Sequence, residues 1–174
     1  MKKTYKRIWN CITTVIVIVI VFLAVTLAGV RIVGLQPYVV LSGSMEPTYH
    51  VGSMIYVKSV DYKELYVGDP ITYLLSEDVV STHRIVGIYP DENDPETLRF
   101  ATKGDANADI DSGLVHYKNI IGKPVFTIPY LGYFFSFIKQ PPGIYVAIVV
   151  GVLLVFFMFL PEVLSDKKKS PDKK

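Results

Sequence analysis

The stretch from residue 39 to residue 48 decides how the rest of the chain is interpreted, and it is Val39-Val40-Leu41-Ser42-Gly43-Ser44-Met45-Glu46-Pro47-Thr48. By composition Ser-Gly-Ser is an ordinary surface turn, because serine and glycine favour turns for conformational reasons alone. The alternative interpretation makes Ser44 a nucleophile that a tight backbone presents to a base from elsewhere in the chain. The residues on either side of this stretch decide between the two.

Two long apolar segments flank most of the 174-residue chain. Residues 8–30 contain no Asp, Glu, Lys or Arg, and residues 143–160 form a second uncharged run that ends at Pro161-Glu162. About 20 apolar residues in a helix cross the hydrocarbon core of a bilayer, so we predict transmembrane helices at residues 8–30 and 143–161. The first run exceeds the ~7–15 apolar residues of a cleaved signal sequence, which favours a retained anchor over a signal peptide.

Lysine and arginine are concentrated at the two ends of the chain. Four precede the first apolar segment and five follow the second, whereas residues 31–139 hold nine Lys and Arg against thirteen Asp and Glu, a balance of −4. Basic flanks stay on the cytoplasmic side of a membrane. We therefore predict a plasma-membrane protein with cytoplasmic tails at 1–7 and 162–174 and an extracytoplasmic domain at 31–139. Its partner is the lipid bilayer, and the acidic domain argues against a nucleic-acid partner.

The domain between the apolar segments is predicted to be mainly β. Short β-branched and aromatic runs bounded by turn residues predict strands at 38–41, 54–58, 71–75, 79–89, 98–102 and 120–128. Residues 61–65 are a helical turn or loop, and the aromatic residues of 130–138 lie either in the core or at the membrane interface. The single cysteine, Cys11, lies in the first apolar segment, so the domain depends on its own hydrophobic core.

A serine nucleophile needs a base, and usually a third group that orients the base. Of the three histidines, His83 stands in the longest predicted strand, while His50 and His116 have polar, loop-like surroundings. A histidine on a half-buried strand is otherwise an ordinary structural residue. Asp105, Asp109 and Asp111 are the candidate carboxylates, and Asp105 could instead stabilise a turn. The loop lacks the carboxylate run and closing glutamate of an EF-hand, so no metal or cofactor is predicted.

Four motifs follow one another along the chain. They are Ser42-Gly43-Ser44-Met45-Glu46-Pro47-Thr48, Gly68-Asp69, Ser81-Thr82-His83-Arg84-Ile85, and Lys103-Gly104-Asp105-Ala106-Asn107 with Asp111 beyond. Behind an N-terminal anchor, this order resembles that of type I signal peptidases. It resembles in particular the endoplasmic-reticulum type, which is shared by eukaryotic, archaeal and some sporulating Gram-positive bacterial enzymes. Ordinary bacterial members carry a lysine base where this chain has His83.

The resemblance implies a β-rich catalytic domain between two transmembrane helices. It implies a serine endopeptidase that removes signal peptides from exported preproteins, cutting after a small residue at the outer membrane face. Ser44 matches the nucleophile and His83 the general base. Asp111 matches the acid that orients His83, and Asp105 matches a second important aspartate; either could contact His83, with Asp111 ranked first. The Ser44 N–H and Ser42 are the candidate oxyanion-hole donors.

Two other hypotheses stay open at this stage. One is a processing peptidase with the same chemistry and a narrow set of clients. The other is a catalytically idle, membrane-anchored module that binds exported segments. Four intact candidate catalytic residues argue against the idle module, which has no chemical need for them. Membrane-protein partners of either form are left open.

Overall fold

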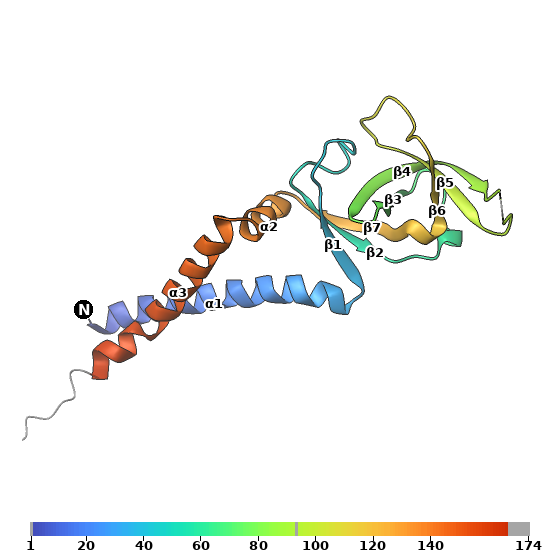
Figure 1. The fold of residues 1–174 in the computed structure, drawn as a ribbon. Coiled ribbons are helices and arrows are strands. Elements are labelled where there is room, and N and C mark those ends of the chain that lie inside the picture. The colour runs from blue at the N-terminus through green and yellow to red at the C-terminus, as the bar shows by residue number, and fades with distance from the viewer. Residues whose placement is uncertain (1, 93, 167–174) are drawn as a thin grey trace, which may run out of the picture. The chain divides into compact units, whose positions relative to one another are not determined.

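The computed structural model describes residues 2–92 and 94–166 (Figure 1). The chain forms two compact units, one made of Met1–Val25 with Phe135–Lys174 and the other of Thr26–Phe134. The predicted tails at 1–7 and 162–174 fall partly on residues 1 and 167–174, which, with residue 93, lie outside the described residues.

The unit Thr26–Phe134 is built on a seven-stranded antiparallel sheet. The strands are β1 (Leu35–Val39), β2 (Met54–Lys58), β3 (Pro70–Ser76), β4 (Val79–Pro90), β5 (Leu98–Lys103), β6 (Leu114–His116) and β7 (Ile120–Ile128), with short 3-10 turns η1 (Tyr62–Glu64) and η2 (Tyr117–Asn119). Their order in the sheet is β1-β2-β7-β3-β4-β5-β6. The long strand β7 therefore joins the pair β1–β2 to the group β3–β6 (Figure 1).

The predicted β-rich class is confirmed, with two differences in detail. The first strand covers Leu35–Val39 and not 38–41, because the backbone leaves the sheet at Val40 to begin the loop that carries Ser44. Pro37 lies inside this strand, which is tolerated because β1 is at the sheet edge. Strand β6 was not predicted, since three residues are too few to show an alternating pattern.

The core of this unit lies around strands β3, β4 and β5. Its buried members are Leu65, Ile71, Tyr73, Ile85, Phe100 and Val115. Ile85 on β4 is wholly buried, and side chains two residues apart on a strand share a face. Because Ile85 is fixed in the core, His83 leaves β4 on the same side, at the border of the core.

Three helices account for the apolar segments: α1 (Lys2–Ile32), α2 (Leu131–Lys139) and α3 (Gly143–Asp166). Within the described ranges no single helix is both long and apolar enough to cross a bilayer, whereas Leu131–Lys139 and Gly143–Phe157, bent by 93°, meet that test together. Membrane crossing by residues 8–30 and 143–161 therefore stays a prediction. The aromatic residues of 130–138 belong mostly to α2.

Candidate active site

The loop between β1 and β2 holds Ser44 in a fixed turn. Its base is closed by two backbone bonds, from Val40 N–H to the Ser53 carbonyl (2.9 Å) and from Gly52 N–H to the Val40 carbonyl (2.9 Å). Met45 is buried and anchors the loop next to the serine. Ser44, directly before this anchor, is only partly covered. The buried Met45 side chain therefore fixes the orientation of the turn.

A second segment packs directly on the turn that carries Ser44. The Ser44 carbonyl accepts a hydrogen bond from Ala106 N–H at 2.9 Å. A Cβ atom on Gly104 would lie 2.5 Å from the same carbonyl oxygen, so the close approach requires glycine at this position. The Lys-Gly-Asp motif thus contributes a surface against which Ser44 is positioned.

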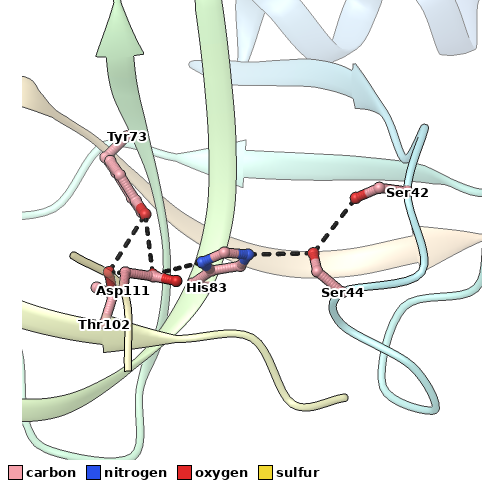
Figure 2. Close-up of polar contacts among 6 residues, drawn as sticks. All are labelled: Ser42, Ser44, Tyr73, His83, Thr102 and Asp111. Atoms are coloured by element: carbon pink, nitrogen blue, oxygen red, sulfur yellow. Dashed lines mark hydrogen bonds and ion pairs between the residues drawn. The ribbon is translucent and has the colours of Figure 1, made fainter. Parts of the chain in front are cut away.

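Ser44, His83 and Asp111 form one hydrogen-bonded line (Figure 2). The distance from His83 Nε2 to Ser44 Oγ is 3.1 Å, and from His83 Nδ1 to Asp111 Oδ2 it is 2.6 Å. An ionised carboxylate only accepts hydrogen bonds, so the imidazole proton lies on Nδ1. In the neutral ring Nε2 is then an acceptor, and Ser44 Oγ–H donates to it.

The line is sheltered from solvent at its centre. The His83 side chain is 12% exposed and that of Asp111 is 24% exposed. Partial burial reduces competition from water and strengthens the hydrogen bonds of the line. The arrangement can accept a proton from Ser44 without any group having to move into place.

Two further donors stand near Ser44 Oγ. The Ser42 hydroxyl lies 3.3 Å from it (Figure 2). Within residues 2–92 and 94–166 the Ser44 N–H donates to no acceptor. Both predicted oxyanion-hole groups are therefore beside the nucleophile.

Asp105 lies in a different set of contacts and does not bond His83. It accepts two bonds from Arg84, at 2.8 Å from Nε and 2.6 Å from Nη2, and a third from the Thr48 hydroxyl. Arg84 also donates from Nη1 to the Gly68 carbonyl at 2.7 Å. The Arg84 guanidinium, aided by the Thr48 hydroxyl, holds the pKa of Asp105 below its usual range.

The remaining candidates lie outside this line. His50 pairs with Glu46 in an exposed position, and His116 Nδ1 accepts the Lys118 N–H at 3.2 Å. Asp109 is exposed. In the part of the chain that the structure describes, no three His, Cys, Asp or Glu side chains are grouped as metal ligands.

Two residues at the site were not singled out from the sequence. Thr102 Oγ1 donates to Asp111 Oδ2 at 2.7 Å, and Tyr73 OH lies 3.4 Å from the same oxygen (Figure 2). Burial raises the pKa of the Tyr73 phenol, which keeps it a neutral donor. The only feature of the sequence that could have indicated Thr102 is its position directly before the Lys-Gly-Asp motif. No feature of the sequence indicated a role for Tyr73, because a tyrosine in a strand is by default a core residue.

A hydroxyl, an imidazole and a carboxylate in line, with donors beside the hydroxyl, are the arrangement that serine hydrolases use. The comparison with known families names the member of that class. Residues 11–124 match the family described as signal peptidase, peptidase S26. The chain belongs to the signal peptidase family.

Known relatives come from both bacteria and animals. The chain is 40% identical over 123 residues to signal peptidase I W of Bacillus subtilis, a match that covers 66% of this chain and 63% of that protein. It is 30% identical over 102 residues to the signal peptidase complex catalytic subunit SEC11C of Homo sapiens and of Canis lupus familiaris, covering 54% of this chain and 52% of each. The chain thus spans about half to two thirds of the length of these relatives.

Proposed function

We propose that the chain is a membrane-bound serine endopeptidase that removes signal peptides from exported preproteins. Ser44 is the nucleophile, His83 the general base, Asp111 the group that orients it, and Asp105 a structural partner of the nucleophile loop. The observation that carries the proposal is the Ser44–His83–Asp111 line, with 3.1 Å and 2.6 Å between the bonded atoms. Family membership supports the substrate class.

The first chemical step forms a tetrahedral intermediate on Ser44. Ser44 Oγ attacks the carbonyl carbon of the scissile peptide bond while its proton passes to His83 Nε2. Asp111 stabilises the imidazolium through Nδ1–H. The substrate oxygen gains negative charge, which the Ser44 N–H and the Ser42 hydroxyl stabilise. Each such donor contributes about 2.7–4 kcal/mol in a related site.

The next two steps form the acyl-enzyme and hydrolyse it, and each releases one product. His83 Nε2–H gives its proton to the departing amine nitrogen, and the C–N bond breaks. Water then attacks the acyl carbon, with His83 again taking the proton, and Ser44 Oγ leaves with that proton restored. The mature protein departs with a free amino terminus, and the signal peptide departs with a free carboxylate.

The membrane setting follows from the apolar segments. We propose that residues 8–30 and 143–161 cross the plasma membrane with both termini cytoplasmic and the catalytic domain outside. A signal peptide is itself held in the bilayer, so confinement raises its effective concentration at Ser44. It binds as an added strand, with backbone bonds for affinity and shallow pockets that accept small side chains before the cut.

The test is cleavage of a synthetic preprotein in detergent by the wild type and by Ser44→Ala. The substrate carries alanine at the first and third positions before the scissile bond. We expect the wild type alone to cleave this substrate, directly after the alanine at the first position before the scissile bond. If the folded wild type leaves this substrate and a panel of other preproteins intact, the proposal is wrong, and the idle binding module replaces it.

A further inference from the structure

Thr102 holds Asp111 by two contacts at once. Its side-chain hydroxyl donates to Asp111 Oδ2 at 2.7 Å, and its backbone carbonyl accepts the Asp111 N–H at 2.9 Å. Thr102 is wholly buried near the end of β5 and pairs there with Ile85 of β4. A residue of the rigid sheet therefore fixes both the main chain and the carboxylate of a residue on a loop.

Tyr73 adds a second buried hydroxyl to the same group. Its OH lies 3.2 Å from Thr102 Oγ1 and 3.4 Å from Asp111 Oδ2, and its side chain is almost wholly buried on β3. Thr102 has a single hydroxyl proton, and its shorter contact is with Asp111. Tyr73 then supplies its own proton to the Thr102 oxygen or to Asp111, which keeps the pair connected (Figure 2).

Two buried hydroxyls are an expensive choice for core positions. A buried hydroxyl without a hydrogen bond destabilises a protein, whereas an apolar side chain of the same shape does not carry this cost. The other buried members of the core cluster that contains Tyr73 are apolar: Leu65, Ile71, Ile85, Phe100 and Val115. The hydroxyls of Thr102 and Tyr73 therefore point to a role that valine and phenylalanine, which have similar shapes but no hydroxyl, could not perform.

We infer that Thr102, supported by Tyr73, is a positioning residue that sets the Asp111 carboxylate against His83 Nδ1. Asp111 lies in the loop between β5 and β6 and its side chain is 24% exposed, so the loop alone leaves it several rotamers. Thr102 and His83 both belong to the sheet, on adjacent strands β5 and β4. Asp111 is bonded to both and takes its orientation from them. The role in catalysis rests on the proposed function.

The decisive variant is Thr102→Val, which keeps the shape and removes the donor. Thr72 provides a matched control, because it is also a wholly buried strand threonine and its hydroxyl bonds Thr82 at 2.8 Å, outside the Asp111 contacts. Thr102→Ser restores the hydroxyl on a smaller side chain. Tyr73→Phe removes the more distant donor.

Cleavage kinetics give the first readout. We expect Thr102→Val to lower kcat by about 10-fold to 100-fold with KM little changed, which is the effect of losing one hydrogen bond to a charged group. Thr102→Ser should recover most of the loss, and Tyr73→Phe should lower kcat by about threefold. Thr72→Val should leave kcat unchanged. Equal losses in Thr102→Val and Thr72→Val would overturn the inference, because both would then reflect packing.

The second readout does not depend on cleavage. The chain has three histidines, and selective ¹⁵N-histidine labelling, with His50→Gln and His116→Gln as assignment controls, identifies the His83 Nδ1–H signal in the NMR spectrum. We expect the far-downfield Nδ1 proton signal of His83 in wild type, Thr102→Ser and Thr72→Val, and its loss or strong broadening in Thr102→Val.

The two readouts separate the two ideas. If the wild type shows the His83 signal but cleaves nothing, the proposed function fails, and the positioning inference is judged by the spectrum. If Thr102→Val keeps both the His83 signal and the wild-type kcat, Thr102 does not position Asp111 and the inference is wrong.

Discussion

Asp105 and Asp111 belong to one loop but bond different partners. Asp111 bonds the imidazole of His83 and two hydroxyls, and so lies at the end of the hydrogen-bonded line from Ser44. Asp105 bonds the guanidinium of Arg84 and the hydroxyl of Thr48, and so ties strand β4 to the loop that carries Ser44. In the proposed mechanism the first aspartate orients a base that changes charge, whereas the second neutralises the permanent charge of Arg84.

The difference shows that residue type does not determine role within this loop. His83 and Arg84 are neighbours on β4 and point to opposite faces, so they receive different carboxylates. An arginine stays charged at every working pH and so favours the anionic form of its partner. A histidine needs its partner in one orientation to keep the proton on Nδ1. Changing each residue in turn tests this comparison.

The largest effect is expected from His83→Ala, at the centre of the Asp111 line. Removing the base should lower kcat/KM by about 10⁴-fold or more. The oxyanion-hole donors should still support a low residual activity. Peptide cleavage assays measure the loss, and thermal unfolding in detergent checks that the fold is intact. Near-normal turnover by His83→Ala or His83→Lys would break the comparison, because Asp111 would then have no base to orient.

Asp111→Asn should give the next largest loss, about 10²-fold to 10⁴-fold in kcat, because an amide at this position can favour the wrong imidazole tautomer. In a His83→Ala background the same change should cost little more, since residues that act as one unit are not additive. Multiplicative losses in the double variant would mean that Asp111 acts on something other than His83.

Asp105→Asn should lower activity by only about 10-fold, through a small displacement of the Ser44 loop. Its main effect should be on stability, a loss of about 1–3 kcal/mol in the free energy of unfolding, because the partly buried Arg84 loses a charged acceptor. Asp109→Asn, at an exposed position of the same loop, is the control and should be neutral in both assays. A 10³-fold loss of activity with unchanged stability would assign Asp105 to catalysis.

The smallest expected effect is the change with pH in the difference between the unfolding free energies of wild type and Asp105→Asn. Arg84 lowers the pKa of Asp105 in the folded chain. A carboxyl of this kind contributes stability above its unfolded pKa of about 3.9, and the contribution disappears as pH falls through the folded value. Wild type and Asp105→Asn should therefore differ by a constant amount from about pH 5 to pH 8 and converge in acid. A difference that persists unchanged to pH 2 would contradict the Arg84 pairing.

The sequence predicts the local features of this chain well. Strands at 54–58 and 120–128 match β2 and β7 residue for residue, because β-branched and aromatic runs bounded by turn residues are a local signal. The order of motifs was enough to indicate the family. β6 was beyond such reasoning, since its pairing with β5 supplies what three residues of local preference do not.

The sequence by itself determined that a serine, a histidine and an aspartate were available, and that Ser44 and His83 were the best of their kind. Only the tertiary structure decided that Asp111, and not Asp105, meets His83, because the five residues between the two aspartates form a loop without regular periodicity. The same holds for Thr102 and Tyr73. Their contacts depend on how β3, β4 and β5 bring distant hydroxyls to one carboxylate, and no local pattern in a chain records which strands will be neighbours.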